Sequence, residues 1–214
     1  MESRQSGIIK IFESDDILKK IVIGTKNEKK LLELKDAFRD LPVEVISISE
    51  FANIPDAVED GETFSDNAKI KAEFFMKNTG CACIADDSGL EVDALNGLPG
   101  VHSARFAGFH AEDGTNNRKL MEELEKVGVE ESRADYRCAL VFVDTDGTKL
   151  ETGGVCYGTI KKVARGNSGF GYDPYFYFDN GKTMAEMSLE EKDKISHRGA
   201  ALRKMVTLLE DYLS

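Results

Sequence analysis

The chain has 214 residues, and its 28 lysines and arginines against 39 aspartates and glutamates give a formal net charge of −11. This acidity excludes extended binding to nucleic acid or to an anionic membrane surface, because both would repel the chain. It leaves open the binding of one small polyanion, if a few basic side chains and a metal ion gather in a cleft. The hydrophobic fraction of 41% is typical of a globular protein with one domain.

The N-terminal region gives no sign of a targeting segment. Residues 1–19 are mixed and polar with one apolar patch at residues 8–12, and the N-terminus lacks the basic and then apolar layout of a signal peptide. No stretch of the chain approaches the roughly 20 apolar residues of a membrane span. We therefore expect an N-terminal extension at residues 1–20, followed by a single domain at residues 21–214, in a cytoplasmic protein.

The four cysteines lie in apolar, strand-like segments, and no two of them have the Cys-x-x-Cys spacing of a zinc site. This placement predicts reduced, buried thiols, as in a protein of a reducing compartment. The four residues are Cys81, Cys83, Cys138 and Cys156.

The first predicted elements are a strand, a helix and a second strand. An apolar run at residues 21–23 predicts a buried strand, and apolar side chains at helical spacing follow the next turn. Pro42 predicts the end of that helix, and residues 43–48 predict the second strand. Thr63 and Asp66 then form a capping-box pattern, which marks the start of another helix.

The middle of the chain alternates between strands and helices. Gly80 predicts the end of the second helix, and the apolar residues 81–85 predict a buried strand that leads directly into an acidic segment. Gly128 closes a further helix. Residues 134–144 and 148–157 predict a hairpin.

The last predicted elements are helical. Ser188 begins a second capping box, and Ser196 opens the final helix. Parallel units early in the chain and a hairpin late predict an α/β fold with a mixed sheet.

The turn at residues 24–30 lies between a predicted strand and a helix N-terminus. Free backbone N–H groups and the helix dipole make such a place attractive to phosphate. Thr25 and Asn27 add neutral groups and Lys30 adds a cation, but the glycine pattern of a P-loop is missing. An ordinary capped turn with surface lysines is the alternative.

A pair of adjacent carboxylates, Asp86 and Asp87, follows the buried strand at residues 81–85. Ligands of α/β sheets lie at strand ends, and a hard divalent ion such as Mg²⁺ is the natural counter-charge for two carboxylates. The alternative is an Asp-rich turn with Gly89 in a left-handed conformation. Glu59, in a second acidic cluster, could supply another ligand or lie in a solvated loop.

Two later segments carry groups suited to a heterocyclic ligand. Phe170, in the glycine-rich stretch 166–171, offers a stacking face for a base, or else belongs to the core. Lys192, His197 and Arg198 form a donor-rich cluster that suits a carbonyl-bearing ligand. A surface or structural role is the alternative for that cluster.

Together, six motifs resemble the inosine triphosphate pyrophosphatase family, whose members hydrolyse dITP, ITP and XTP to the monophosphate and pyrophosphate. The resemblance covers residues 21 to about 212, in order. The motifs are Thr25-x-Asn27-x-x-Lys30, Thr63-Phe64-x-Asp66-Asn67-Ala68-x-x-Lys71, Ala85-Asp86-Asp87-Ser88-Gly89-Leu90, Pro99-Gly100-Val101-x-Ser103-Ala104-Arg105, Gly169-Phe170-Gly171-Tyr172-Asp173-Pro174 and Ser196-His197-Arg198.

The resemblance implies a role for each matching residue. Asp87 is expected to be the general base and a Mg²⁺ ligand, beside Asp86 and with Glu59 as a further metal ligand. Phe170 is expected to stack on the purine. The expected substrate-binding residues are Thr25, Lys26, Asn27, Glu28, Lys29, Lys30, Lys71, Ser88, Phe170, Gly171, Tyr172, Asp173, Lys192, His197 and Arg198.

The resemblance also implies an architecture: an elongated mixed sheet with flanking helices, two lobes around a central cleft, and a homodimer. Two departures are visible. Lys26 stands where many members have glycine, and Asp66 replaces the commoner glutamate. Residues 1–20 have no counterpart in most members.

A mechanism follows from these expectations. A carboxylate near Mg²⁺ activates a water for attack at the α–β bridge, and lysines offset charge on the leaving pyrophosphate. Lys192, Arg198 and, when it is protonated, His197 present donors. We expect them to favour a 6-oxo purine over adenine, because adenine presents a 6-amino donor to them. Two rival functions stay open: another Mg²⁺-dependent nucleotide pyrophosphatase, and a non-catalytic nucleotide-binding module.

Overall fold

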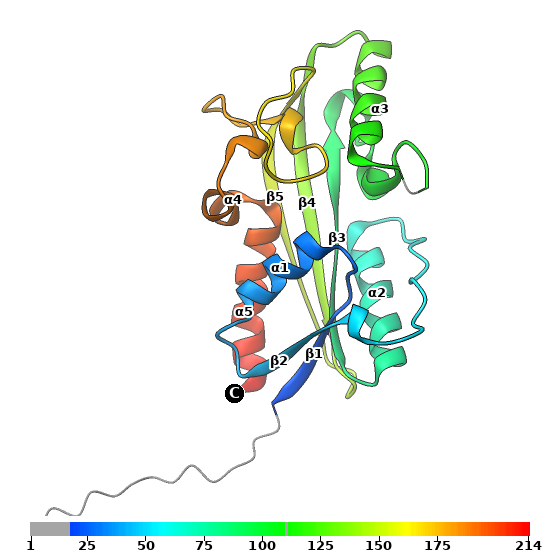
Figure 1. Cartoon of the computed structure of the whole chain (residues 1–214), viewed down its shortest axis with the longest axis vertical. Helices are drawn as coiled ribbons and strands as arrows, with labels where there is room; N and C mark the ends of the chain where they lie inside the picture. Colours follow the sequence, from blue (N-terminus) through cyan, green and yellow to red (C-terminus); the bar gives the residue numbers. More distant parts are fainter. Residues whose placement is uncertain (1–17, 110) are drawn as a thin grey trace, which may run out of the picture.

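The computed structural model describes residues 18–109 and 111–214. The expectations for residues 1–17 therefore lie outside the described part. In the described residues six strands form one sheet in the order β2-β1-β3-β4-β5-β6. Figure 1 shows β3, β4 and β5 side by side. The strands are β1 (Lys19–Ile23), β2 (Val43–Ser47), β3 (Ala82–Val92), β4 (Glu131–Val143), β5 (Lys149–Lys161) and β6 (Phe176–Tyr177).

The sheet is mixed, as predicted. Strand β1 is parallel to β2 and to β3, whereas the pairs β3–β4, β4–β5 and β5–β6 are antiparallel. The predicted hairpin is confirmed as β4 and β5, with longer strands than expected. The α-helices are α1 (Glu28–Ala37), α2 (Phe64–Thr79), α3 (Asp113–Lys126), α4 (Leu189–Ile195) and α5 (His197–Leu213). The described residues also form short 3-10 helices: η1 (Ile48–Glu50), η2 (Asp93–Leu95), η3 (Gly100–Arg105), η4 (Asp173–Tyr175) and η5 (Met184–Glu186).

Local capping groups set the helix ends. Thr63 and Asp66 form the expected capping box of α2, and Gly80 ends that helix with a left-handed φ of 67°. The capping box at Ser188 is also confirmed, at the start of α4. Helix α1 ends at Ala37, well before Pro42, so proline is not what terminates it.

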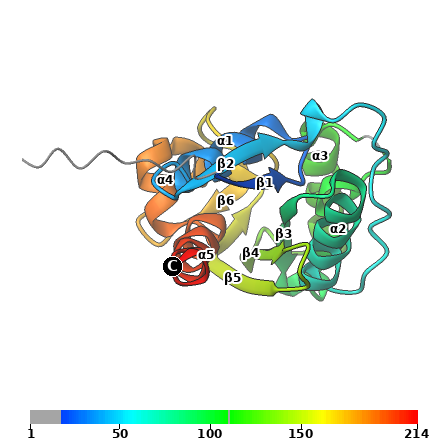
Figure 2. The same ribbon diagram turned by 90° about the horizontal axis from the view of Figure 1, so that it is seen from below.

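Helices cover both faces of the sheet. In Figure 2, α2 and α5 lie on opposite sides of strands β3 to β5. Ile21 and Ile23 pack in one apolar cluster with residues of α1 and α5, while Val22 packs in another with Phe75 of α2. This alternation is the two-residue period of a strand. The same period places successive side chains of β3 on opposite faces of the sheet.

The apolar core divides into two parts. Three clusters occupy the half that contains β1, β2, α1, α2 and the body of α5. A separate cluster joins the far end of β3 to α3, β6 and the middle of β4. The long strands β3, β4 and β5 run through both halves (Figure 1).

Strand β3 corrects one expectation. The acidic segment does not lie in a turn, because β3 continues without interruption from Ala82 to Val92. Gly89 has no left-handed φ. It is required for another reason: a Cβ there would lie 2.5 Å from the Gly100 carbonyl oxygen and 2.8 Å from the Phe64 ring. Gly89 thus lets η3 pack directly on β3.

The cysteines are unpaired, and three of the four are buried. Cys81 is only partly buried and precedes β3, so the expectation of four buried strand thiols is wrong for this residue. Burial raises the pKa of the Cys156 thiol to about 11. Within the residues that the structure describes, no helix is both long enough and apolar enough to cross a membrane.

Candidate active site

The candidate site begins where β1 ends and β3 continues. The pairing of β1 with β3 covers only Ala82 to Ile84, and the Gly24 N–H closes it by donating to the Ile84 carbonyl at 2.8 Å. Beyond that point Asp86, Asp87 and Ser88 lie on β3 without β1 beside them. The end of a parallel strand is the usual place for a ligand in an α/β sheet.

Two adjoining cavities open at this place. We call the first the aromatic cavity; it measures about 150 Å³ and is lined by Phe170, Asp173, Lys192, His197 and Arg198 among others. We call the second the charged cavity; it measures about 280 Å³, and its lining includes Thr25, Lys26, Glu59, Lys71, Asp87 and Arg105. Both cavities are lined by Asn27, Lys30, Ser88 and Ala104. A single elongated ligand could therefore occupy both.

Asp86 lies on the face of β3 that looks toward α1 and α5. Its Oδ2 accepts from Lys30 Nζ at 2.9 Å and from Arg198 at 3.4 Å. Burial opposes ionisation of this carboxyl, but Lys30 and Arg198 outweigh burial and hold its pKa well below the usual range. Asp86 is therefore a permanently charged anchor for two cations.

Asp87 points to the opposite face, toward α2. Its Oδ2 accepts from Asn67 Nδ2 at 3.2 Å, and its Oδ1 lies 3.4 Å from Lys71 Nζ. Burial raises the pKa of Asp87, and the negative charges of Glu59 and Asp86 raise it further. The positive charge of Lys71 lowers it, but the net shift is upward. A carboxylate with a raised pKa is a better proton acceptor, which suits a general base.

The two neighbouring carboxylates therefore contact different partners, because successive strand residues face opposite ways. Glu59 faces the same lysine as Asp87: Lys71 Nζ lies 2.7 Å from Glu59 Oε2. The structure thus joins Glu59 with Asp87 and separates Asp86 from them. Within the described part of the chain, no three His, Cys, Asp or Glu side chains form a ready metal-binding group.

The residues present nevertheless fit a hard divalent cation. Glu59 and Asp87 already converge on one positive charge, the ammonium of Lys71. Carboxylate oxygens are the ligands that Mg²⁺ prefers. Glu59 and Asp87 are the residues that would hold it.

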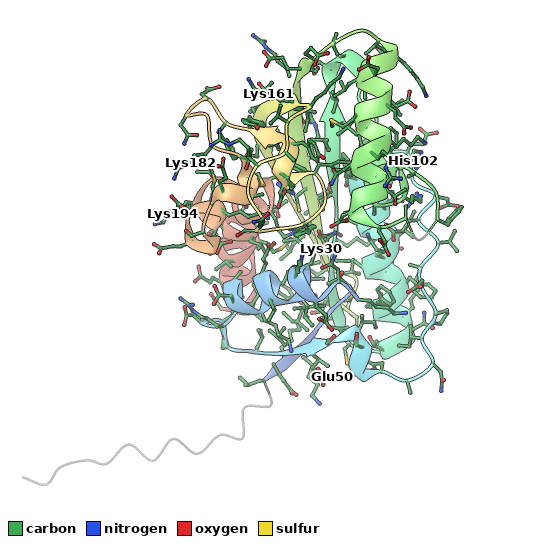
Figure 3. The ribbon with its side chains drawn as sticks, turned by 45° about the horizontal axis from the view of Figure 1, so that its top comes forward. Lys30, Glu50, His102, Lys161, Lys182 and Lys194 are labelled. Atoms are coloured by element: carbon green, nitrogen blue, oxygen red, sulfur yellow. The ribbon has the colours of Figure 1, made fainter. Side chains whose placement is uncertain are left out.

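The turn before α1 is built as a capped helix start. Asn27 is the N-cap, and its side-chain oxygen accepts from the N–H groups of Lys29 and Lys30 at 3.0 and 3.2 Å. Thr25 Oγ1 in turn accepts from the Asn27 N–H. Lys30 lies near the centre of the molecule in Figure 3, while Lys161, Lys182 and Lys194 lie at its periphery.

Not every predicted residue of this turn faces a cavity. Lys26 lines the charged cavity and pairs with Asp56 at 2.6 Å. Glu28 lines neither cavity. Lys29 lines neither as well, and its Nζ donates to the Gly169 carbonyl at 2.8 Å. The predicted substrate contacts of Glu28 and Lys29 stay predictions.

The Phe170 ring is surrounded by positive groups. Lys192 Nζ lies 4.9 Å from the ring centroid, Lys29 Nζ lies 5.4 Å from it, and the Arg198 guanidinium carbon lies 5.7 Å from it. Such cations favour the negative face of an aromatic ring. The backbone N–H of the next residue, Gly171, donates a hydrogen bond to Asp113 Oδ2 at 2.7 Å.

Asp173 organises the wall of the aromatic cavity. This buried carboxylate accepts from Lys192 Nζ at 2.8 Å, from Tyr136 Oη at 3.2 Å and from the Phe170 N–H at 3.1 Å. Tyr172 is buried too, and its hydroxyl donates to the Ser103 carbonyl at 2.8 Å. These two residues form the wall, and the ring of Phe170 is the part that a flat ligand could cover.

His197 and Arg198 open α5 and are both buried. Burial lowers the pKa of His197 well below 6.5, and the nearby charges of Arg198, Lys192 and Lys30 lower it further. At neutral pH the charged donors of this cluster are therefore Lys192 and Arg198. The Arg198 guanidinium donates to Glu33 Oε2 at 2.7 Å and to Ser88 Oγ at 2.9 Å.

Several residues of the site were not predicted. Asn67 and Arg105 stood in motifs that carried the resemblance, but neither received a role. The sequence contains no pattern that marks Glu33, Asp113 or Tyr136 as site residues, because residue order does not show which face of a helix or strand lies at the site.

Residues 21–208 match the Ham1 family. The chain belongs to the Ham1 family. A Desulfotalea psychrophila relative named dITP/XTP pyrophosphatase is 47% identical over 186 residues, which cover 86% of this chain and 82% of the relative. A Geobacter sulfurreducens relative of the same name is 44% identical, with coverage of 91% and 96%.

Solved Ham1 structures share the fold. A HAM1 protein from Coxiella burnetii superposes with a TM-score of 0.84 at 41% identity, covering 91% of this chain and all of the other. The Ham1 protein of Staphylococcus aureus superposes with a TM-score of 0.81 at 40% identity and with the same coverage. The α/β fold with its mixed sheet and the family resemblance are confirmed.

Proposed function

We propose that this chain is a nucleoside-triphosphate pyrophosphatase that hydrolyses dITP, ITP and XTP to the monophosphate and pyrophosphate, and so clears deaminated purines from the nucleotide pool. One observation carries the proposal: an aromatic cavity and a charged cavity share Asn27, Lys30 and Ser88. A base in the first and a triphosphate in the second would form one ligand. The names of the relatives from Desulfotalea psychrophila and Geobacter sulfurreducens support the same activity.

Asp87 is the residue that we propose as general base. Its raised pKa and its two neighbours on α2, Asn67 and Lys71, suit a carboxylate that takes a proton from an attacking water. The water oxygen bonds to phosphorus at the α–β bridge, and the bridging P–O bond breaks as pyrophosphate leaves. Lys30 and Lys71 lie where they would offset the negative charge on that leaving group.

Mg²⁺ is the cofactor that we propose, with Glu59 and Asp87 as the residues that would hold it. When bound, such an ion would offset the negative charge on the phosphate oxygens. We assign Asp86 to the anchoring of Lys30 and Arg198 instead, since it lies on the other face of β3.

Selectivity is proposed to come from the wall of the aromatic cavity. Lys192 carries three donors and uses one on Asp173, which leaves donors for a 6-oxo purine. Adenine would place an amino donor against them. A neutral His197 offers one donor and one acceptor, so it can adjust to the base without adding charge.

The remaining expectations are proposals about the whole protein. We propose that residues 21–214 act as one two-lobed unit and that the protein is cytoplasmic, which the unpaired cysteines support. We also propose a homodimer. A further groove of about 540 Å³ is lined in part by the exposed side chains of Leu98 and Val155, and such apolar side chains suit a second subunit.

A screen for pyrophosphate release tests the proposal. Purified protein is assayed with dITP, ITP, XTP, dATP and dGTP, with and without Mg²⁺, and pyrophosphate and single phosphate are measured separately. We expect metal-dependent release of pyrophosphate, faster with the three deaminated purines. Equal rates on all five would instead indicate another nucleotide pyrophosphatase. Binding without turnover would indicate a non-catalytic module.

A further inference from the structure

Arg105 is a cationic residue of the charged cavity to which the proposed function gives no task. It ends η3, and η3 is fixed on β3 by Ser103, whose hydroxyl accepts from the Leu90 N–H at 2.9 Å and donates to the Gly100 carbonyl at 2.6 Å. Arg105 Nη2 donates to the backbone carbonyl of Glu59 at 3.2 Å. The guanidinium therefore lies beside the segment that carries a proposed metal ligand.

The charge balance of the cavity sets Arg105 apart. Each lysine that lines this cavity is paired with a carboxylate: Lys26 with Asp56, Lys30 with Asp86, and Lys71 with Glu59, at 2.6, 2.9 and 2.7 Å. Arg105 has a carbonyl as its partner, and in the part of the chain that the structure describes it pairs with no carboxylate.

An anion can bind the guanidinium of Arg105 without displacing a carboxylate. To gain full attraction from a paired lysine, a phosphate must compete with the carboxylate that the lysine already holds. Arg105 has no carboxylate to give up, and its planar fork of N–H groups matches two phosphate oxygens at once. It is therefore the group of the cavity that is most available to an incoming polyanion.

The position of Arg105 indicates which part of the ligand it meets. Asn27, Lys30 and Ser88 line both cavities, whereas Arg105 lines only the charged cavity, together with Glu59 and Lys71. A nucleotide whose base lies in the aromatic cavity would place its sugar and first phosphate near the shared residues. Its outer phosphates would then extend toward Arg105.

We propose that Arg105 binds the β- and γ-phosphates, the part of the substrate that leaves as pyrophosphate. This assignment rests on the proposed function. Arg105 holds the outer phosphates in the substrate complex and offsets charge on pyrophosphate as the bridging bond breaks. It makes no contact with the monophosphate product.

A purely structural role would look different. Arg105 also ties the Glu59 segment to η3, and loss of that tie could loosen the cavity. Arg105→Gln keeps an N–H donor for the Glu59 carbonyl but removes the charge, and Arg105→Lys keeps the charge but loses the planar fork. Arg203→Gln is the matched control, because exposed Arg203 likewise donates to backbone carbonyls, those of Asp193 and Lys194, and lines neither cavity.

The test measures binding and turnover separately. Affinity for inorganic pyrophosphate and for dIMP is measured by calorimetry on the wild-type protein and the three variants, and KM and kcat are measured with dITP. In Arg105→Gln we expect affinity for pyrophosphate to fall about tenfold or more and KM for dITP to rise as much. Arg105→Lys should recover part of that loss, and dIMP affinity should stay within about twofold. Arg203→Gln should match the wild type.

Three results would overturn the proposal: unchanged pyrophosphate affinity in Arg105→Gln, an equal loss of dIMP affinity, or Arg105→Lys no better than Arg105→Gln. Thermal unfolding of each variant is recorded first. If Arg105→Gln does not fold, Arg105→Lys alone decides, since loss of the fork should still weaken pyrophosphate binding. If wild-type protein binds pyrophosphate but does not hydrolyse dITP, the proposed function fails while the assignment of Arg105 can still be judged.

Discussion

The imidazole of His197 lies parallel to the phenol ring of Tyr136, with ring centroids 4.9 Å apart and planes 10° apart. The Tyr136 hydroxyl also contacts Asp173, the carboxylate that holds Lys192. Protonation of this imidazole is unfavourable, because the ring is buried and the neighbouring side chains are already positively charged. The neutral state of His197 is thus a consequence of how α5 packs on β4.

The first prediction concerns pH. The unfolded chain protonates His197 at about pH 6.5, whereas burial and the charges of Arg198, Lys192 and Lys30 hold its folded pKa well below that value. Below pH 6.5 the unfolded state therefore binds more protons, and the free energy of unfolding falls by up to about 1.4 kcal/mol per pH unit. Urea unfolding of wild type and His197→Phe between pH 5 and 8 measures this; equal slopes in both would contradict it.

The second prediction concerns Asp87, whose loss should act on catalysis and not on stability. Asp87→Asn keeps the shape and a hydrogen-bond acceptor for Asn67, but it removes the proposed base. We expect kcat for dITP to fall about 10²- to 10⁴-fold while the thermal midpoint changes little. Steady-state kinetics and a thermal melt check both parts. Turnover near the wild-type rate would rule out Asp87 as the base.

The third prediction concerns Asp86, whose loss should act on stability. Asp86→Asn removes the charge that pairs with Lys30 and Arg198 in a buried place. Removal of one partner from a buried ion pair typically costs about 3 kcal/mol or more. Chemical denaturation of Asp86→Asn beside Asp87→Asn measures the difference. Equal stability of the two variants would show that Asp86 is not the anchor.

The fourth prediction concerns close packing at β3. Gly89→Ala would push a methyl group against the Gly100 carbonyl and the Phe64 ring, so we expect a loss of about 1–3 kcal/mol. Gly114→Ala is the control, because its Cβ meets open space in the first turn of α3. That change should be neutral or stabilising by up to about 1 kcal/mol. Urea unfolding of both variants is the measurement, and a stabilised Gly89→Ala would disprove the steric argument.

Local patterns predicted those parts of the fold that depend on neighbours in the chain. The capping boxes at Thr63 and Ser188 and the hairpin of β4 and β5 follow from residues a few positions apart, and all three are confirmed. For the acidic segment after residues 81–85 the sequence leaves a turn open as an alternative, because Asp and Gly favour turns. The pairing of β3 with β4 overrides that preference, since it joins Asp86 to Leu140 and Gly89 to Arg137.

The sequence by itself determined the family, the α/β class and the residue types of the site, because motifs and periodicity are local and survive without coordinates. Only the tertiary structure decided how those residues share their charges. It placed Asp86 and Asp87 on opposite faces of one strand, left His197 neutral, and gave every lysine of the charged cavity a carboxylate while Arg105 received a carbonyl. Such pairings depend on distances between segments far apart in the chain and on burial, and neither can be read from residue order.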